Sequence, residues 1–265
     1  GSGTSYSWTN SNTAIGLVAS GSNLINGFNA SNSGTTSLLG NVNITPIFTF
    51  QGQSCNGPLA SYSITVNPTP FVNTLNDTVI CNNQNAAVNI TTNISANVTW
   101  FATANNNVNG ELTTLQTNTF INDLLSNTSN VPQSISYTIT PTTLAGCVGP
   151  DSFIVVQVQP NVLLNIPQNL EICSGSGVNA VLAANIPSNF SWFCTVNNPN
   201  VSGESLLINS GALINDILVN ITNQNQLVVY SVTPTSIQGN CQGPAQTITV
   251  IVKPPLALLN QDTVT

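Results

Sequence analysis

Three tryptophans, Trp8, Trp100 and Trp192, stand 92 residues apart, and the residues around them are alike. A Cys-x-Gly-Pro motif follows each tryptophan and begins at Cys55, Cys147 and Cys241. Self-similarity at a fixed period indicates tandem copies of one structural unit. The chain is therefore predicted to fold as a string of similar modules. The question of function is then what such an array does, and not which single active site it contains.

Prolines that close strand-like runs set the predicted module boundaries. The predicted division is a truncated repeat, two complete repeats and the start of a further repeat, at residues 1–68, 69–160, 161–254 and 255–265. Each complete copy opens with a stretch that leads to Cys81 or Cys173, whereas the first copy has no such opening. We therefore expect a segment of a longer array. The sequence leaves open whether Gly1 is native or an added start.

Composition and periodicity predict an all-β chain. Only 3% of the residues are charged, yet 41% are apolar and lie in short alternating runs rich in β-branched residues. About seven short strands in each copy of roughly 90 residues are typical of an antiparallel, immunoglobulin-like β-sandwich, with Trp100 and Trp192 between the sheets. Residues 121–125 and 214–218 fit either a helical turn or a strand edge. No apolar stretch is long enough to cross a membrane, and no leader pattern is present, so we expect no membrane insertion.

The cysteines predict disulfides. Cys81 and Cys147 fall in one copy, and Cys173 and Cys241 fall at matching places of the next, which predicts one bridge within each complete copy. Cys55 matches Cys147 and Cys241, so its expected partner lies upstream of Gly1. Cys194 is left over and is either a buried free thiol or half of an intermolecular bridge. No Cys-x2-Cys pair and no histidine is present, so we expect no metal site.

The inventory of side chains argues against an enzyme. The chain has no histidine, which removes Ser-His-Asp and Cys-His nucleophile activation. A glycosidase needs two carboxylates that face one bond; the recurring candidates are Glu111, Glu204, Asp123 and Asp216. The first copy lacks them, so turn or surface roles are expected, with no catalytic residue and no cofactor. The predicted junctions offer no carboxylate cluster for calcium, and a net charge of −7 argues against nucleic acid.

Several short motifs together resemble a known family. Trp8, the Ile44-Thr45-Pro46 strand end, the Cys55-x-Gly57-Pro58 motif, the closing run at residues 64–70 and their counterparts in later copies resemble PKD-like and immunoglobulin-like repeats of giant Bacteroidota surface adhesins, including those of gliding motility. The resemblance implies export by type IX secretion and display as an extracellular filament that other parts of the protein anchor to the outer membrane. It implies as partners extracellular surfaces or polysaccharide, neighbouring repeats, and the secretion and gliding machinery.

Two Asp-Thr-Val triplets resemble a glycan acceptor of the same bacteria. Thr78 and Thr263 lie in these triplets, which match the Asp-Ser/Thr-aliphatic pattern for O-glycosylation. An Asp-Thr pair that caps a turn at the start of a strand explains them equally well. Both readings stay open at this point.

The sequence thus predicts a structural shaft segment of a repetitive adhesin, for surface attachment or gliding. The alternative is a carbohydrate-binding or partner-binding β-sandwich of a secreted multidomain enzyme. Matching copies favour the shaft, because an enzyme accessory module normally differs from its neighbours.

Overall fold

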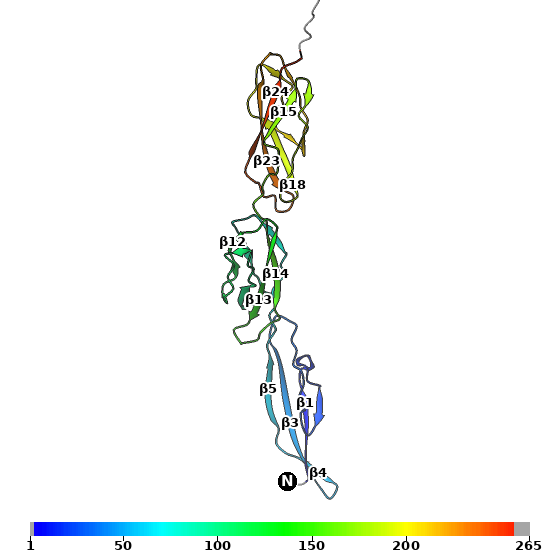
Figure 1. The fold of residues 1–265 in the computed structure, drawn as a ribbon. Coiled ribbons are helices and arrows are strands. Elements are labelled where there is room, and N and C mark those ends of the chain that lie inside the picture. Colours follow the sequence, from blue (N-terminus) through cyan, green and yellow to red (C-terminus); the bar gives the residue numbers. More distant parts are fainter. Residues whose placement is uncertain (1–2, 257–265) are drawn as a thin grey trace, which may run out of the picture.

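The computed structural model describes residues 3–256, and it is a rod of three β-rich modules arranged end to end (Figure 1). We name them the first module (β1 to β5), the second module (β6 to β14) and the third module (β15 to β24). The N-terminus lies at one end of the rod (Figure 1). Almost all of the predicted start of a further repeat, with Thr263, lies outside the described residues.

The first module contains five strands and one short 3-10 helix. They are β1 (Thr4–Asn10), η1 (Thr13–Ile15), β2 (Ser20–Ser22), β3 (Leu38–Phe50), β4 (Gln53–Asn56) and β5 (Ala60–Val66). All five strands belong to one sheet, in which β3 pairs with β1, β4 and β5. No second sheet covers it within the described residues.

The second and third modules share one plan of two layers. The strands of the second module are β6 (Thr78–Ile80), β7 (Gln84–Asn85), β8 (Val88–Asn89), β9 (Asn97–Ala102), β10 (Val108–Asn109), β11 (Phe120–Ile121), β12 (Leu124–Asn127), β13 (Gln133–Thr142) and β14 (Ser152–Val158). The strands of the third module are β15 (Asn169–Cys173), β16 (Ser176–Gly177), β17 (Ala180–Val181), β18 (Ser188–Cys194), β19 (Val201–Ser202), β20 (Asn209–Ser210), β21 (Leu213–Ile214), β22 (Ile217–Asn220), β23 (Gln226–Ser236) and β24 (Gln246–Lys253).

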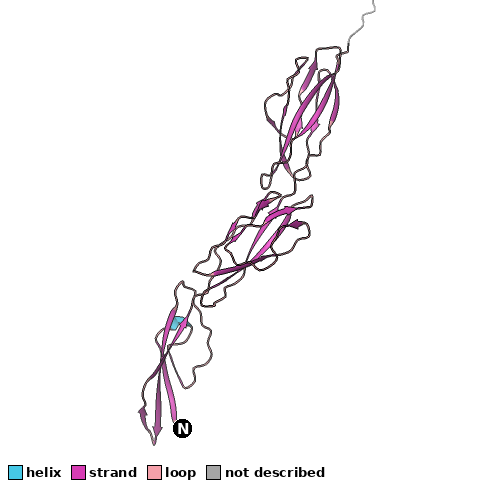
Figure 2. Ribbon diagram, turned by 90° about the vertical axis from the view of Figure 1, so that its left-hand side faces the viewer, coloured by secondary structure: helices cyan, strands magenta, loops and turns pink. Residues whose placement is uncertain are grey.

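One sheet of each sandwich is long, and the other consists of short ladders (Figure 2). The long sheets run in the order β6-β14-β13-β9 and β15-β24-β23-β18-β20. The opposing layers are β10-β12-β7 with β11-β8, and β16-β22-β19 with β17-β21. The predicted all-β sandwich is confirmed. The two open segments at residues 121–125 and 214–218 form strand ends rather than helical turns.

Strict alternation along the long strands builds the core. In β13 and β14 every second side chain is buried, which places one face of the sheet against the second layer. Trp100 is 1% exposed and packs edge-to-face on Tyr137, and its Nε1 donates to the backbone and side-chain oxygens of Asn118. Trp192 packs in the same way on Tyr230. Both tryptophans therefore lie between the sheets, as the sequence predicts.

One pairing departs from the antiparallel prediction. The opening strands β6 and β15 pair in parallel with the closing strands β14 and β24. The connection between two parallel neighbours must cross the module, and here the remaining strands make that crossing. The end of each opening strand consequently lies beside the end of the closing strand, at the exit of the module.

Candidate functional site at the junction of two modules

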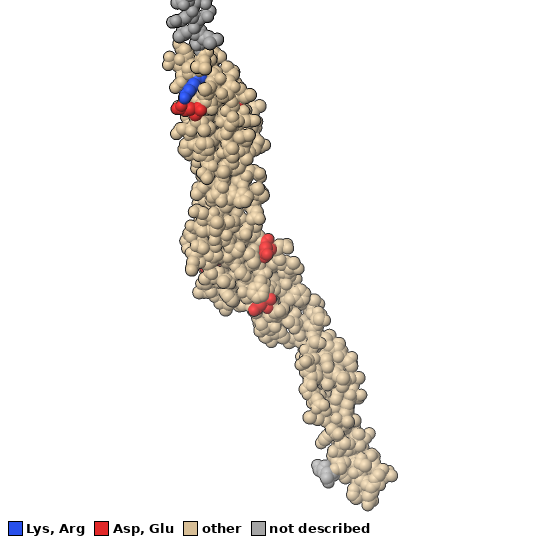
Figure 3. All heavy atoms as spheres, turned by 45° about the vertical axis from the view of Figure 1, so that its right-hand side comes forward, with Lys and Arg blue, Asp and Glu red and all other residues tan. Residues whose placement is uncertain are grey.

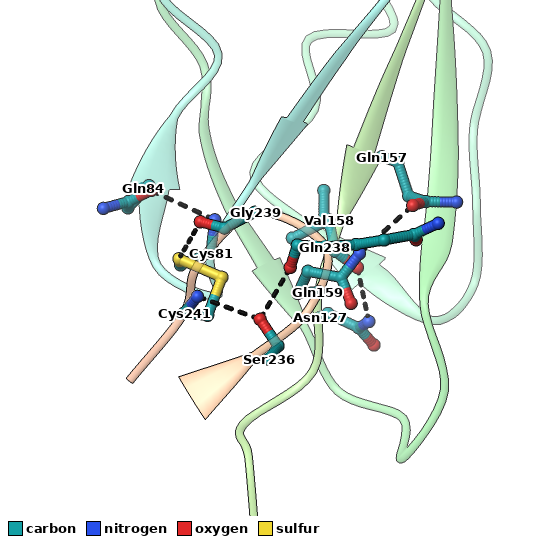
Figure 4. Close-up of a disulfide and its surroundings, with 10 residues drawn as sticks. All are labelled: Cys81, Gln84, Asn127, Gln157, Val158, Gln159, Ser236, Gln238, Gly239 and Cys241. Carbon is teal, nitrogen blue, oxygen red and sulfur yellow. Dashed lines mark hydrogen bonds between the residues drawn. A yellow bond between two sulfur atoms is a disulfide. The ribbon is translucent and has the colours of Figure 1, made fainter. Parts of the chain in front are cut away.

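Cys81 is placed at the upper end of the second module by the parallel strand before it. Ile80 lies opposite Val158, the last residue of β14, and the Gln159 N–H donates to the Ile80 carbonyl at 2.9 Å. Cys81 follows at once and therefore lies where the chain leaves towards the third module. Its own N–H donates to Gln84 Oε1 at 3.0 Å, which holds the turn after β6 (Figure 4).

Cys241 lies in the corner loop between β23 and β24, at the lower end of the third module. Three hydrogen bonds define this loop: Ser236 N to the Cys241 carbonyl at 2.9 Å, Cys241 N to Ser236 Oγ at 2.9 Å, and Gly243 N to the Pro234 carbonyl at 2.9 Å. The Ser236 hydroxyl donates in turn to the Gln238 carbonyl at 2.6 Å. The loop is thus fixed by its own bonds and presents Cys241 to the module below.

A disulfide joins Cys81 to Cys241 across the junction, with the two Cα atoms 5.4 Å apart (Figure 4). The prediction of bridges within each module, from Cys81 to Cys147 and from Cys173 to Cys241, is therefore wrong. Cys147 lies in the loop before β14, at the opposite end of the sheet from Cys81. A seven-residue strand such as β14 spans roughly 23 Å, whereas a disulfide needs Cα atoms about 4.4–6.8 Å apart.

Apolar packing surrounds the bridge. Val162, Ile186 and Cys241 are buried together, and Cys81 packs against them. Gly239 adopts a φ of +75°, and a Cβ at this position would lie 3.1 Å from Val79 Cγ1 of the second module. A side chain there would be strained and crowded. The junction is therefore a packed contact between modules, with the disulfide at its edge.

The glycines of the second and third Cys-x-Gly-Pro motifs are explained by the linkers that enter their modules. A Cβ at Gly149 would collide with the Pro70 carbonyl, and a Cβ at Gly243 would collide with the Val162 carbonyl. The backbone of the incoming linker thus lies directly on the corner loop. The motif is a docking point for the linker, which sequence reasoning did not assign.

A cleft of about 300 Å³ lies between the two modules beside the bridge. Its lining comes from both sides of the junction: Pro132, Gln159, Ile186, Pro187, Ile237 and Gln238. Gln159 is only 2% exposed, and its Nε2 donates to Gln157 Oε1 at 3.1 Å. No acid, base or nucleophile lines the cleft, so its chemistry supports packing rather than a reaction.

The recurring acids are committed to structural hydrogen bonds. Asp123 Oδ2 accepts the Leu112 N–H at 2.9 Å and the Tyr137 hydroxyl at 2.9 Å. Asp216 does the same with Ser205 N at 2.8 Å and Tyr230 at 2.7 Å. Burial raises the pKa of both tyrosines above the usual range, and the neighbouring aspartates raise it further.

The recurring glutamates cap turns. Glu111 Oε1 accepts the Asn105 N–H at 3.1 Å, and Glu204 Oε1 accepts the Asn198 N–H at 3.1 Å. Burial raises the pKa of Glu204. These carboxylates hold loops of their own modules.

Comparison with known proteins identifies the modules. The family model described as "PKD-like domain" matches residues 78–162 and 170–255, which together are more than half of the chain. The chain belongs to the PKD-like domain family. The first module lies outside both PKD-like matches. No curated protein sequence matches the chain.

Several solved structures are similar to this chain at low sequence identity. The titin I-band fragment I67–I69 is 12% identical, with a TM-score of 0.40, and the alignment covers 97% of this chain and 89% of that one. Mouse cadherin-23 EC22–24 is 9% identical, with a TM-score of 0.38 and coverage of 94% and 85%. The fibronectin(III)-like modules of Clostridium thermocellum CbhA are 10% identical, with a TM-score of 0.28 and coverage of 70% and 95%.

Four cysteines are free in the structure, and they lie in three different settings. Cys55 is exposed on β4 at the N-terminal end of the rod, and Cys147 is half-buried in the corner loop of the second module. Cys173 is exposed at the end of β15. Cys194 is 2% exposed, and its thiol donates to the Val196 carbonyl at 3.2 Å, so it is the buried free thiol of the two alternatives.

Of the two predicted glycan acceptors, only Thr78 lies among the described residues. Thr78 opens β6 and is half-buried, and the neighbouring Asp77 accepts the Val155 N–H at 2.8 Å. The aspartate thus anchors the opening strand to β14. O-glycosylation of Thr78 stays a prediction, and Thr263 lies outside the described residues.

A buried asparagine that sequence reasoning missed recurs in all three modules. Asn127 Nδ2 donates to the Val131 carbonyl at 2.8 Å and to the Val158 carbonyl at 2.9 Å, and its Oδ1 accepts the Ser129 N–H. Asn32 and Asn220 make the equivalent three bonds. Each of these asparagines holds the end of the closing strand of its own module, and we call this arrangement the asparagine clasp. Their near-period spacing was the signal, but asparagine is too common here to stand out.

Among residues 3–256, no helix is long and apolar enough to cross a membrane. The same residues contain no group of three or more potential metal-ligating side chains.

Proposed function

We propose that this segment is a load-bearing part of the shaft of a long, repetitive cell-surface adhesin, for surface attachment or gliding motility. The Cys81–Cys241 bridge is the observation that carries the proposal. It closes a loop with a sequence separation of 160 residues, which holds nearly all of the second and third modules.

The bridge changes the path that tension takes through the chain. A pull along the rod enters at the linker near residue 69, reaches Cys81 through β6, crosses the disulfide to Cys241, and leaves through β24. Residues 82–240 lie outside this covalent path. Such a bridge suits a tether under tension, because the residues inside the loop add no length to the chain even if the two modules unfold.

The surface of the rod also suits a tether exposed to changing surroundings. Few charged groups are visible on the rod (Figure 3), and the one ion pair among the described residues joins Lys253 to Glu171 at 2.8 Å on the surface. Interactions that depend on salt are therefore few. The acids are structural, so we infer that this segment carries no catalytic residue.

The family resemblance supplies the proposed setting. Bacteroidota surface adhesins of this kind are exported by type IX secretion, and we propose the same extracellular location, with anchoring at the outer membrane through other parts of the protein. The proposed partners are extracellular surfaces or polysaccharide, neighbouring repeats, and the secretion and gliding machinery.

Single-molecule force spectroscopy of residues 1–265, held at both ends, tests the proposal. With the bridge closed, the second and third modules together release only the residues outside the loop. Reduction, or the pair Cys81→Ser and Cys241→Ser, frees the loop and adds about 55 nm of extension, at roughly 3.3–3.6 Å for each residue. Cys147→Ser is the matched control and leaves the extension unchanged. Full release of both modules from the oxidised chain would refute the load-bearing role.

A further inference from the structure

Cys173 is the counterpart of Cys81 in the third module. It ends β15, which runs parallel to the closing strand β24 and places Cys173 opposite Lys253 at the upper end of the module. In the second module the same arrangement carries Cys81 to the junction. Cys173 is exposed and free.

In the second module, the upper face around Cys81 is covered by the third module. The equivalent upper face of the third module lies around Cys173. A surface cleft of about 430 Å³ lies here, lined by Cys173, Asn225, Lys253 and residues 254–256, among others. In the repeat, Asn225 and Lys253 take the places of Pro132 and Gln159, which line the covered cleft beside the Cys81–Cys241 bridge. The cleft on the third module has no covering module in the described part of the chain.

The corner loop that presents the second cysteine of such a bridge has the same hydrogen bonds whether its cysteine is bridged or free. In the second module, Thr143 N donates to the Cys147 carbonyl at 3.0 Å, and Cys147 N donates to Thr143 Oγ1 at 3.0 Å. Ser236 and Cys241 make the same pair of bonds in the third module. A corner cysteine is thus held in its bridging position before any partner arrives.

We infer that Cys173 forms a second intermodular disulfide, with the corner cysteine of a PKD-like module that packs on the upper face of the third module. The inference rests on the proposed array. It extends one staple to a ladder in which each opening cysteine is bonded to the corner cysteine of the next module.

Bridge formation needs an oxidant of the disulfide class. The two thiols lose two protons and two electrons to form one S–S bond, and the oxidant's disulfide takes them up as two thiols. An extracellular route provides such conditions. Glutathione disulfide serves this purpose in the experiment below.

The open upper face of the third module differs in charge from the covered upper face of the second module. Glu171 and Lys253 stand where the covered junction has Val79 and Gln159, and they form an ion pair on the open face. Val79 contacts the Gly239 region of the module above. A copied third module would therefore meet a charged pair instead of the neutral pair that its own corner loop now contacts.

The experiment adds a second copy of residues 161–254 directly after Pro254, with the exposed changes Ala245→Ser and Asn169→Gln in the added copy as mass labels for its corner peptide and its Cys173 peptide. The protein is oxidised with glutathione disulfide and mapped without reduction. We expect a Cys173 peptide linked to the labelled corner peptide, together with the Cys81–Cys241 link. Alkylation of the unlabelled Cys173 peptide, which comes from the original copy, should fall at least tenfold relative to the unextended chain.

Two variants keep the test decisive. Cys173→Ser in the original copy removes the labelled link if it crosses the junction, whereas persistence of the link would mean a bridge within the added copy and would overturn the inference. Glu171→Val with Lys253→Gln in the original copy recreates the covered face. If Cys173 stays open to alkylation in this variant too, while Cys81–Cys241 forms, the inference is wrong. The load-bearing proposal is unaffected, because it depends on the Cys81–Cys241 bridge alone.

Discussion

The first and second modules share a tryptophan strand but differ in what covers it. In the first module only four buried residues form the main core, Trp8, Ile15, Leu17 and Val42, whereas seventeen do so in the second. The second module has a second layer of short ladders and a parallel opening strand; within the described residues the first module has neither. The tryptophan strand and the asparagine clasp therefore mark the repeat, while the opening strand and second layer provide the enclosed core and the intermodular bridge.

The largest expected difference between these modules concerns the tryptophans. Trp100→Ala should lower the free energy of unfolding of the second module by about 3–5 kcal/mol, the usual cost of a buried aromatic. Trp8→Ala should cost less, because fewer buried side chains surround it. Native-state hydrogen exchange read by mass spectrometry reports each module separately. An equal or greater loss in the first module would contradict the comparison.

The tyrosine–aspartate pair sharpens the contrast, because Val42 of the first module stands where the second has Tyr137. Tyr137→Phe removes one of the two hydrogen bonds described for Asp123 and should cost about 1.5–3 kcal/mol at pH 7, as for a bond to a charged group. Val42→Ala is the control in the first module: it removes side-chain volume at the matching place without removing a hydrogen bond. It should not change how the stability of the first module depends on alkaline pH.

The same pair predicts a pH dependence. Burial raises the pKa of Tyr137 above its ordinary value of 10.0, so the folded state favours the neutral phenol. This stabilisation is complete below pH 10 and is lost as the pH rises further. Hydrogen exchange protection of the second module should therefore fall above pH 10 in the wild type and fall less steeply in Tyr137→Phe. Identical alkaline profiles would exclude this linkage.

The asparagine variants should lower stability by similar amounts in the first and second modules, in contrast to the tryptophan variants. Asn127→Ala leaves the Val131 and Val158 carbonyls without their side-chain donor and should cost about 1–3 kcal/mol. Asn32→Ala should cost a similar amount in the first module, since its bonds to Thr36 and Val66 are equivalent. Urea denaturation followed by hydrogen exchange measures both, and a negligible effect at Asn32 would show that the first module does not depend on the clasp.

The smallest effect is expected at Cys194. The second module has Ala102 at the matching place, so Cys194→Ala should cost about 1 kcal/mol or less in the third module, a small-residue change that loses roughly one buried group. Burial raises the pKa of the thiol above its ordinary value of 9.0, and the associated stabilisation is lost as the pH rises above 9. The variant should lack this part of the alkaline loss. Serine at the same place is the polar control and should be less stable than alanine.

Sequence by itself determined the repeat, the β-sandwich class and the buried tryptophans. The fixed period made the modules visible, and alternation with period two identifies strands whose one face is buried, as in β13 and β14. The absence of histidine removed the commonest catalytic devices. These conclusions depend on composition and local pattern, which the sequence states directly.

Only the tertiary structure decided which cysteines pair. The repeat places Cys81 and Cys147 in one copy, so a bridge within the module and a bridge between modules fit the period equally well. The parallel pairing of β6 with β14 separates them, because it carries Cys81 to one end of the sheet while Cys147 lies at the other. Strand direction in a sheet is set by long-range packing and leaves no local mark in the sequence, and the 160-residue separation of Cys81 and Cys241 is closed only when two folded modules stack.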